Sequence, residues 1–518
     1  MFKLNVIIVL LTVLVQCSSS YKLLCFFPFP SRSHANLGEG FVKYLLNDGH
    51  EITYVTPIPM RSNHERLRQV DVGSLMEFAK GLNFHEVLKL EADDRQILMV
   101  MHVMNRISEL AVKHERVQEL VNRPGEHFDA VIVEWMFNEL YSGFSAVFNC
   151  PLIWSASMDV HWLDVRIMHE APSVSYSAYA VSGTTPPFTL KQRVLELYAR
   201  VKVVFLQKWF ISSKEIQLYY EAFGPAVEAR GRELPPYDDL RVNGSIMFGN
   251  SHPCIADAIS LPQNYKFIGG YHIIESDMEP LPNVLKQRMD ESKYGVIFFS
   301  LGSIVNTQTI SEEFKNNLLQ VFASLKQTVI WKLDARTKNV PKNVVLVKWA
   351  PQQSILAHPN TVLFITHGGL LSINEAIHFG VPVLGTPLFG DQFMNIGKLV
   401  QKGMAKSVKL SSDLQLHLKT DIEEMVSNSS YRLRAQELSE IYHDRLVKPG
   451  EEIAHWVQHV VRTGGAPHLR SPALLVPWYQ AFYLDVLALA FVVFYAILVV
   501  FRLLNGKRVL VSDVKKVN

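Results

Sequence analysis

Short apolar runs alternate with longer amphipathic stretches along most of this 518-residue chain. Residues 21–29 predict a buried strand, residues 37–47 predict a helix that Gly49 closes, and residues 52–55 predict the next strand. A further apolar run, at residues 128–133, predicts a later strand of the same kind. This alternation of strand and helix is typical of a parallel sheet with helices on both faces.

The same pattern starts again in the second half of the chain. Residues 294–303 predict a buried strand that ends in a Gly-Ser turn, and residues 328–333 and 344–347 predict further strands with helices between them. Proline and glycine interrupt the pattern between the two halves. We therefore predict an α/β fold with two doubly wound Rossmann-like domains, residues 21–262 and 271–465, that face a cleft.

The two ends of the chain predict a membrane-anchored protein. Residues 1–20 have an early lysine, an apolar centre and small residues at the end, which is typical of a secretory signal peptide. Residues 486–504 are long and apolar enough to form a transmembrane helix, and the basic tail, residues 505–518, predicts a cytosolic side. Lys515 and Lys516 resemble a retrieval signal of the endoplasmic reticulum. We therefore expect a type I single-pass protein whose two Rossmann-like domains lie in the lumen of the endoplasmic reticulum.

The composition argues against nucleic-acid binding, a disulfide framework and a cysteine metal site. The net charge is +2 and 19% of the residues are charged, which does not favour a nucleic-acid partner. Beyond the signal segment, Cys25, Cys150 and Cys254 are too few for a disulfide framework and have no metal-ligand spacing. Asn243 and Asn428 begin Asn-x-Ser triplets and are predicted N-glycosylation sites of a luminal domain.

The strongest local signal is a predicted cradle for a nucleotide diphosphate. Residues 362–365 form an apolar strand that leads directly into His367, Gly368 and Gly369. Two adjacent glycines allow backbone to approach a ligand closely. The helix predicted next, at residues 371–379, would point its N-terminus and unpaired N–H groups at the same place, which suits a diphosphate.

Residues around this cradle supply the groups that a nucleotide sugar needs. Glu375 lies one turn into the helix, where its carboxylate can accept both hydroxyls of a ribose, and Trp349 offers a flat face to a base. A second strand, residues 381–384, leads to a loop that carries Asp391 and Gln392. A strand, two glycines and a helix are weak evidence alone, but this run of residues as a whole is a strong signal.

The run from Trp349 to Gln392 resembles the signature of family 1 UDP-glycosyltransferases, animal microsomal branch. In this chain the run reads W-x-P-Q-x₃-L-x-H-P, then F-x-T-H-G-G-x₅-E and then G-x-P-x₈-D-Q, and the resemblance extends over nearly the whole chain. It implies a GT-B type fold with a C-terminal transmembrane helix, whose last helices cross back to the first domain. It also implies that the second domain binds the UDP-sugar, through Trp349, Gln352, Glu375, His367, Ser303, Gly369, Ser372, Asp391 and Gln392.

The resemblance divides these donor-site residues among the parts of the ligand. Trp349 and Gln352 are assigned to uracil and Glu375 to ribose. Asp391 and Gln392 are assigned to the sugar hydroxyls, and the diphosphate to His367, Ser303, Gly369 and Ser372. No Asp-x-Asp motif lies near this site, so we expect neither a metal ion nor a cofactor beyond the UDP-sugar. The Leu-Leu-Ser sequence after the glycines is similar to that of invertebrate members, which favours UDP-glucose as the donor. Arg32 is the one assured cation that could bind the carboxylate of UDP-glucuronate.

Chemistry on an acceptor hydroxyl needs a base, and His34 is the candidate. A lone loop histidine is normally a solvated residue, but its Ser-His context matches the position of the family's catalytic base. The family pairs that histidine with an aspartate. This chain has Glu134 at the matching position, so the expected partner of His34 departs from the family pattern. Asp129 and Glu139 are weaker rivals for that role.

The acceptor is the least determined part of the prediction. Residues 160–220 are expected to be helical and could line an apolar acceptor pocket, although ordinary helix packing explains them equally well. We predict an inverting transferase that moves glucose to a hydroxyl of a small lipophilic acceptor, as in detoxification. A steroid or a membrane lipid as acceptor stays open, as does a non-catalytic carrier of UDP-sugar or lipophile. The sequence is also compatible with a homo-oligomer.

Overall fold

The computed structural model describes residues 20–81, 94–168, 173–177, 184, 186–303, 310–334, 337–409 and 414–514. All but the last residue of the expected signal peptide lie outside these ranges, as do Lys515 and Lys516. The chain divides into two compact units, Met1–Arg470 and Ser471–Asn518. Both sheets and the candidate site lie in the first unit.

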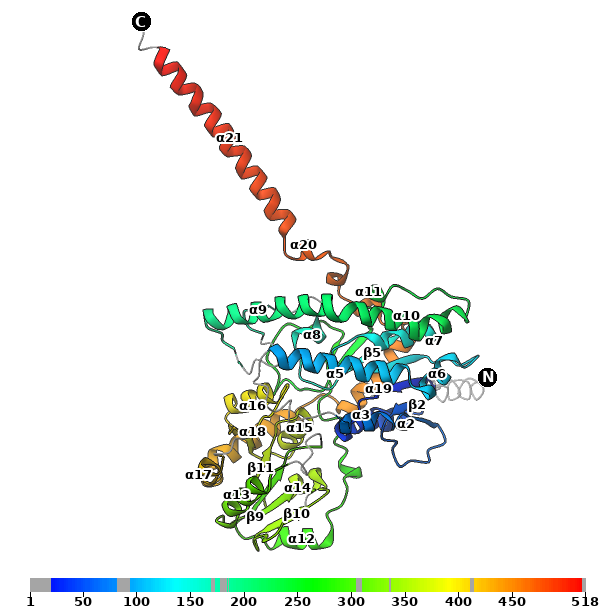
Figure 1. The fold of residues 1–518 in the computed structure, drawn as a ribbon, viewed down its shortest axis with the longest axis vertical. Coiled ribbons are helices and arrows are strands. Elements are labelled where there is room, and N and C mark those ends of the chain that lie inside the picture. The colour runs from blue at the N-terminus through cyan, green and yellow to red at the C-terminus, as the bar shows by residue number, and fades with distance from the viewer. Residues whose placement is uncertain are drawn as a thin grey trace, which may run out of the picture. The chain divides into compact units, whose positions relative to one another are not determined.

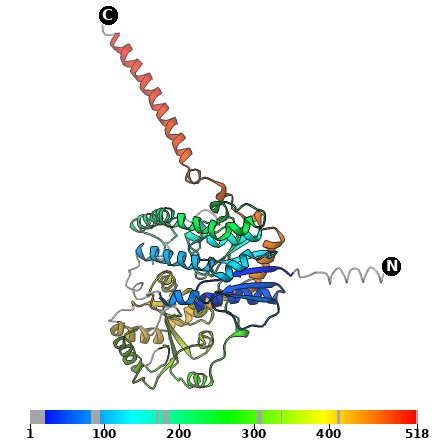
Figure 2. The same ribbon diagram turned by 45° about the vertical axis from the view of Figure 1, so that its right-hand side comes forward.

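The first sheet is wholly parallel and has seven strands (Figures 1 and 2). Its strands are continuous apolar runs because helices bury both faces. Leu24 and Phe26 pack on one face of the sheet, while Leu23 and Cys25 pack on the other. In spatial order the strands are β3 (Leu67–Asp71), β2 (Glu51–Thr56), β1 (Lys22–Phe26), β4 (Ala130–Trp135), β5 (Leu152–Ala156), β6 (Ile246–Gly249) and β7 (Tyr265–Phe267).

Helix α2 (Arg32–Asn47) begins five residues earlier than the expected start at residue 37. The reason is the side chain of Ser31, which accepts a hydrogen bond from the N–H of His34 and caps the helix there. His34 therefore lies in the first turn of a helix and not in a loop. The other helices that follow the first strands are α3 (Leu75–Gly81), α5 (Asp94–Val112), α6 (Glu115–Asn122), η1 (Leu140–Ser142) and α7 (Gly143–Phe148).

The second sheet is also wholly parallel and has six strands, in the order β10-β9-β8-β11-β12-β13. Its predicted strands lie within about two residues of their expected places, because apolar runs flanked by turn residues mark them clearly. They are β10 (Val344–Val347), β9 (Thr328–Lys332), β8 (Val296–Ser300), β11 (Thr361–Thr366), β12 (Val383–Gly385) and β13 (Ala405–Ser407). The helices are η3 (Glu275–Asp277), α12 (Asn283–Asp290), α13 (Glu312–Ala323), α14 (Gln352–Ala357), α15 (Leu370–His378), α16 (Gln392–Gln401), α17 (Leu414–Ser427) and α18 (Ser429–His443).

The chain crosses between the two sheets in ways that shift the expected domain limits. Strand β7 belongs to the first sheet although it begins at Tyr265, beyond the expected limit at residue 262. Helix α19 (Pro449–Arg462) follows the second sheet in sequence but packs against α2 of the first (Figure 1). Its Ile453, Val457 and Val460 are fully buried in the core on that face. The chain thus returns to the first domain through α19, as the family resemblance implied.

The expected helical segment at residues 160–220 is only partly helical. The short α8 (Trp162–Val165) ends before a connection that reaches to residue 189, and α9 (Leu190–Leu206) then continues through a π-helical turn, η2 (Gln207–Ile211), into α10 (Ser212–Glu228). Pro186 and Pro187 lie in that connection, where a helix cannot easily continue. A short α11 (Tyr237–Leu240) leads on to β6.

The second unit consists of short helical turns and one long helix. Helix α21 (Leu484–Val514) contains a segment, Leu484–Leu504, that is long and apolar enough to cross a membrane. This segment begins two residues before the expected start at residue 486. The helix also runs on into the basic tail, whose lysines and arginine the sequence placed on the cytosolic side.

Candidate active site

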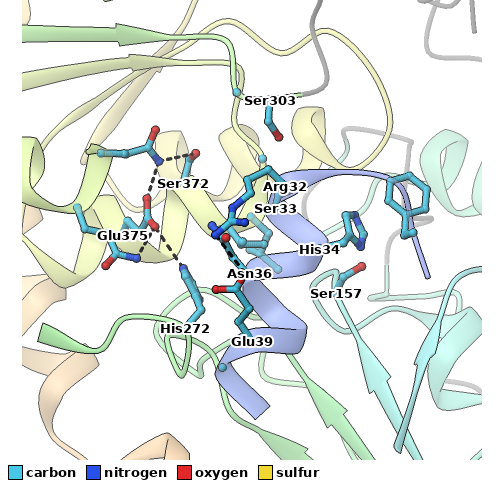
Figure 3. A pocket seen from close by; sticks show the side chains of 18 of the residues that line it. Arg32, Ser33, His34, Asn36, Glu39, Ser157, His272, Ser303, Ser372 and Glu375 are labelled. Atoms are coloured by element: carbon cyan, nitrogen blue, oxygen red, sulfur yellow. Dashed lines mark hydrogen bonds and ion pairs between the residues drawn. The ribbon is translucent and has the colours of Figure 1, made fainter. Parts of the chain in front are cut away.

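A cavity of about 410 Å³ lies where the carboxyl ends of the two sheets meet. His34 follows β1, and Met136 and Ser157 follow β4 and β5 on the first sheet; Lys332 ends β9 and His367 follows β11 on the second. This is the place where open parallel sheets bind ligands. Figure 3 shows His34 and Ser157 on one side of the cavity and Glu375 on the other.

Every donor-site residue expected from the sequence lines this one cavity. The set comes from four separate connections, after β8, β10, β11 and β12 of the second sheet, which the fold brings together. It comprises Ser303, Trp349, Gln352, His367, Gly369, Ser372, Glu375, Asp391 and Gln392.

His34 and Glu134 form a buried pair at the first-domain side of the cavity. Nδ1 of His34 is in hydrogen-bond contact with Oε1 of Glu134, and Glu134 is only 1% exposed. The other carboxylate oxygen of Glu134 has no hydrogen-bond partner among the residues that the structure describes. The ring of Phe29 packs against the imidazole, with the ring centroids 4.2 Å apart. Because Nδ1 is engaged by the carboxylate, Nε2 is the nitrogen that His34 can offer to a ligand.

The two rival carboxylates lie in other surroundings. Asp129 precedes β4, at the amino end of the sheet and away from the cavity, where its Oδ2 accepts a hydrogen bond of 2.7 Å from the backbone N–H of Lys22. Glu139 is buried and accepts a hydrogen bond of 3.1 Å from Nε1 of Trp135. Neither residue lines the cavity.

Glu375 is the centre of a hydrogen-bonded cluster at the second-domain side (Figure 3). Gln352 donates to one carboxylate oxygen and Gln353 to the other, the latter at 3.0 Å. Nε2 of His272 lies 3.4 Å from the same carboxylate, an electrostatic contact rather than a well-formed hydrogen bond. Burial acts to raise the pKa of Glu375, but His272, Gln353 and Gln352 outweigh it and hold the pKa below its usual value. Glu375 is therefore an anion that can accept hydrogen bonds.

Gln352 also donates to the hydroxyl oxygen of Ser372 at 3.0 Å. Ser372, which the sequence assigned to phosphate, thus lies within the Glu375 cluster. Its hydroxyl hydrogen stays available to a ligand, because Ser372 acts as the acceptor in that contact.

His367 is packed between two glycines. A Cβ atom on Gly302 would lie 2.5 Å from Cε1 of His367, and one on Gly369 would lie 2.7 Å from Nε2. Gly302 also has a φ of +80°, which favours glycine. Burial, with a smaller contribution from Lys332, lowers the pKa of His367 to about 4, so its ring is neutral at pH 7. The two glycines therefore leave room for a neutral imidazole beside the backbone at the cavity.

The N-terminus of α15 opens into the cavity beside this histidine. Gly369 is its N-cap and, with Leu370 and Leu371, lines the cavity. The N–H groups of the first turn have no partner within the helix, and the helix dipole adds a partial positive charge there. This end of the helix can accommodate an anion, as the sequence predicted.

Asp391 and Gln392 are held in position by the start of α16. Asp391 is its N-cap and accepts a hydrogen bond of 2.9 Å from Asn395, while Oε1 of Gln392 accepts from the backbone N–H groups of Leu388 and Phe389. Burial raises the pKa of Asp391. Since the oxygen of Gln392 is engaged, its amide NH₂ is the group it can offer to a ligand.

Lys332 is a cavity residue that sequence analysis missed. Its ammonium donates a hydrogen bond of 3.0 Å to the carbonyl oxygen of Gly302 and lies 5.2 Å from the centre of the Trp349 ring. No carboxylate of the described part of the chain forms an ion pair with it, and burial lowers its pKa. The sequence did contain a signal, a lysine at the end of a buried strand. A cation in such a place needs an anion nearby.

The cavity also has a polar edge formed by α2. Arg32, Asn36, Glu39 and Lys43 repeat at helical spacing and all line it. Arg32 lies 3.1 Å from a carboxylate oxygen of Glu39, so the cation considered for a glucuronate is already paired.

Apolar side chains line the rest of the first-domain wall: Val100, Met104, Met136, Phe137 and Met158. None of the described residues between 160 and 220 lines the cavity, so the structure does not support this segment as an acceptor wall. Within the described residues, no group of three or more His, Cys, Asp or Glu side chains is arranged to hold a metal ion.

Two parallel sheets whose carboxyl ends meet at one cavity are the arrangement of the GT-B fold. The crystal structure of the glycosyltransferase VinC in complex with dTDP aligns with a TM-score of 0.56 at 16% identity, over 86% of this chain and 100% of that chain. At this identity the likeness concerns the fold.

Sequence comparison identifies the family. Residues 53–517 match the family described as UDP-glucoronosyl and UDP-glucosyl transferase. UDP-glucosyltransferase 2 of Dactylopius coccus is 30% identical, over 95% of this chain and 93% of its own length. UDP-glucuronosyltransferase 2B15 of Rattus norvegicus is 39% identical over 43% of this chain and 42% of its own. The chain belongs to the family 1 UDP-glycosyltransferases, enzymes that transfer a sugar from a UDP-sugar to an acceptor.

Proposed function

We propose that this enzyme transfers glucose from UDP-glucose to a hydroxyl of a small lipophilic acceptor, with inversion at the anomeric carbon. One observation carries the proposal: the His34–Glu134 pair reaches the cavity from the first sheet, whereas Lys332, His367 and the start of α15, which suit a diphosphate, line it from the second. A base and a leaving-group site on opposite walls are what a direct displacement needs.

The reaction would proceed in one displacement. Nε2 of His34 takes the proton of the acceptor hydroxyl while the acceptor oxygen attacks the anomeric carbon. The bond from that carbon to the phosphate oxygen breaks, and UDP leaves with the bonding electrons. Glu134 stabilises the imidazolium that forms on His34 and fixes its ring. Attack from the face opposite the departing UDP inverts the anomeric configuration.

The departing diphosphate is stabilised by the chain's own groups. Lys332 supplies a positive charge, neutral His367 and Ser303 supply hydrogen-bond donors, and the first turn of α15 supplies N–H groups from Gly369 onward. We propose on this basis that turnover needs neither a metal ion nor a cofactor. Activity that disappears with a chelator and returns with a divalent cation would contradict this.

The nucleoside part of the donor would occupy the Glu375 side. Trp349 is 52% exposed and can stack on uracil, with Gln352 at its edge. The anionic Glu375 can accept hydrogen bonds from both ribose hydroxyls, because each of its oxygens has a second lone pair beside the one that accepts from Gln352 or Gln353. Ser372 can add its hydroxyl to the adjacent phosphate.

Glucose is the preferred donor sugar for an electrostatic reason. Asp391 and Gln392 offer one acceptor and one donor to sugar hydroxyls, and Arg32 is already paired with Glu39. The carboxylate of a glucuronate would therefore meet no unpaired cation on the α2 edge. The relative from Dactylopius coccus bears the name of a glucosyltransferase, which supports the same choice.

The apolar wall formed by α5 and the loops after β4 and β5 supports a lipophilic acceptor. A steroid or a membrane lipid would satisfy the same wall and remains the second candidate class. A non-catalytic carrier is disfavoured, because the His34–Glu134 contact keeps the base in place despite the change from aspartate to glutamate.

We further propose a setting in the lumen of the endoplasmic reticulum, where the conjugation would serve detoxification. The apolar segment Leu484–Leu504 supports a single anchor. Asn243 and Asn428 are exposed and accessible to glycosylation. Digestion with an endoglycosidase should shift the mobility of the full-length protein, and loss of the shift in Asn243→Gln and Asn428→Gln variants would assign the sites.

The deciding experiment is UDP release by the full-length protein in membranes. UDP-glucose and UDP-glucuronate would be compared with a panel of phenols, flavonoids and steroids, beside a His34→Ala variant. Turnover that needs acceptor, prefers UDP-glucose and is lost in His34→Ala supports the proposal. Preference for UDP-glucuronate would overturn the donor assignment, and turnover that survives the substitution would overturn the base.

A further inference from the structure

Glu375 is a buried carboxylate whose one ion-pair partner in the described part of the chain is a histidine. Nε2 of His272 lies 3.4 Å from Oε1 of Glu375, and no described lysine or arginine forms an ion pair with that carboxylate. A carboxylate that leaves water without a compensating group is costly. An imidazole can offset this cost as a cation or, when it is neutral, through a ring N–H.

His272 is itself buried and has no ordinary hydrogen-bond partner. Its side chain is completely buried, and neither ring nitrogen forms a hydrogen bond with a described residue. Buried ring nitrogens normally have such partners. Figure 3 shows the imidazole directed toward Glu375, where the dashed line marks their contact. The contact with Glu375 thus stands in place of hydrogen bonds for this side chain.

The contact influences the charge of Glu375. Burial has the largest effect on the pKa of Glu375 and acts to raise it, while His272 is the strongest of the groups that lower it, ahead of the two glutamines. Without His272, two neutral amides alone would have to compensate for burial. A carboxyl group that takes up a proton becomes a donor at one oxygen. It could then accept a hydrogen bond from one ribose hydroxyl but not from both.

The fold fixes the backbone that carries His272. The N–H of Gly269 donates a hydrogen bond of 2.8 Å to the carbonyl oxygen of Ser251, and Arg445 donates one of 2.8 Å to the carbonyl oxygen of Gly269. A Cβ atom on Gly269 would lie 2.6 Å from the same oxygen of Ser251. Gly270 has a φ of +89°, which favours glycine. The place of the imidazole is therefore set by a tightly packed turn.

This turn connects the ribose side of the cavity to the first sheet. It follows β7 directly, and Tyr271 packs on Phe41 of α2, with ring centroids 4.9 Å apart, in the core on that face of the sheet. The next residue, His272, contacts Glu375 of α15, which belongs to the second sheet. Two consecutive residues thus join the core of the domain that carries His34 to the carboxylate that would bind the donor.

We propose that His272 is a positioning residue for the donor: it keeps the carboxylate of Glu375 charged and in place, so that both ribose hydroxyls are recognised. The inference rests on the proposed function, in which Glu375 binds the ribose. Because the side chain of His272 is completely buried, it acts through Glu375 and not by contact with the nucleotide. Recognition of the ribose then depends on a residue that no motif of the donor site contains.

The test compares UDP with its dideoxy analogue, which lacks both ribose hydroxyls, in calorimetric titrations of the full-length protein. We expect the unaltered protein to bind UDP about 10- to 100-fold more tightly than the analogue, the range of hydrogen bonds to a charged group. In His272→Leu this preference should fall several-fold, because UDP loses affinity while the analogue does not. His272→Gln, which retains an N–H donor, should keep part of the preference.

The matched control is His378→Leu. It removes a histidine–glutamate contact of 3.0 Å, with Glu275, at the other end of α15 and outside the cavity. This variant should leave the preference for UDP over the analogue unchanged. Equal losses of affinity for both nucleotides in His272→Leu, with the preference retained, would show that His272 has only a structural role and would overturn the proposal.

Glu375→Gln separates this inference from the proposed function. It should remove the preference, and His272→Leu added to it should have no further effect on the ratio of the two affinities. A preference that survives in Glu375→Gln would overturn both the ribose assignment and the role of His272. A preference lost in Glu375→Gln but kept in His272→Leu would overturn the role of His272 alone. A failure of the transfer reaction itself would be seen separately, in the release of UDP.

Discussion

The ammonium of Lys398 lies 2.7 Å from the carboxylate of Asp159, and both side chains are almost completely buried. Lys398 belongs to α16 of the second sheet, whereas Asp159 follows β5 of the first. Asp257 adds a second carboxylate oxygen at 3.1 Å. Burial acts to lower the pKa of Lys398, but the two carboxylates outweigh it and raise the pKa above its usual value. Because α16 begins at Gln392, this ion pair fixes the Asp391–Gln392 part of the cavity wall to the domain of the first sheet.

Removing the ammonium of Lys398 should strongly destabilise the protein. Lys398→Met leaves the buried carboxylate of Asp159 and the partly exposed carboxylate of Asp257 without their cation, and the expected loss in the free energy of unfolding is about 3–5 kcal/mol. Thermal and urea unfolding of the detergent-solubilised protein would measure it. The matched control is Lys286→Met, which removes an exposed ion pair with Asp290 and should cost at most about 0.5 kcal/mol. A loss as small as that of the control would mean that the pair is not buried in solution.

Glu134 should contribute to turnover and not to donor binding. Glu134→Ala is expected to lower kcat by about 10²-fold, because His34 loses the carboxylate that orients it and stabilises its imidazolium form. Glu134→Asp, which restores the residue of the family pattern, should lose less. The dissociation constant of UDP should stay the same in both variants. An unchanged kcat in Glu134→Ala would show that the contact in the structure has no role in the reaction.

Lys332 should recognise the diphosphate and not the nucleoside. Lys332→Met is expected to weaken the binding of UDP by about 10- to 100-fold, the range of one charge-assisted hydrogen bond, and to leave uridine binding unchanged. Calorimetric titration with the two ligands separates these effects. Lys348→Met is the control, since Lys348 is 85% exposed and pairs with Asp334. Equal losses for UDP and uridine would instead indicate a general disturbance of the cavity around Trp349.

Stability should fall as the solution is acidified below pH 6.5. Burial lowers the pKa of His367 to about 4 and that of His252 to about 3, so the unfolded chain binds more protons than the folded one between these values and the usual 6.5. The free energy of unfolding therefore decreases as the pH falls through this window, and the contribution of each neutral histidine is complete above it. Melting temperatures measured from pH 7 to pH 5 test this. His252→Gln, at a position outside the cavity, should show a shallower decrease than the unaltered protein.

Local sequence patterns predicted the strands of both sheets because each strand is an apolar run buried on both faces. They were less reliable where one polar side chain determines the structure. Ser31 starts α2 before the first apolar position of the helix, and so it moves His34 from an expected loop into a helical turn. Patterns also failed at residues 160–220, where α9 buries charged side chains and exposes apolar ones. Apolar residues at helical spacing do not by themselves show whether that side of the helix is buried in the protein or exposed.

The sequence alone determined the family, the paired parallel sheets and a set of residues that line one cavity, because short motifs at strand ends contain these residues in a fixed order. Only the tertiary structure decided which distant groups meet. It brings Glu134 to His34 from 100 positions away, places Lys332 over Trp349, and buries Lys398 against Asp159 across the two domains. These contacts depend on how the strands of each sheet are ordered and how the sheets face each other. That arrangement follows from packing over the whole chain, which no local pattern contains.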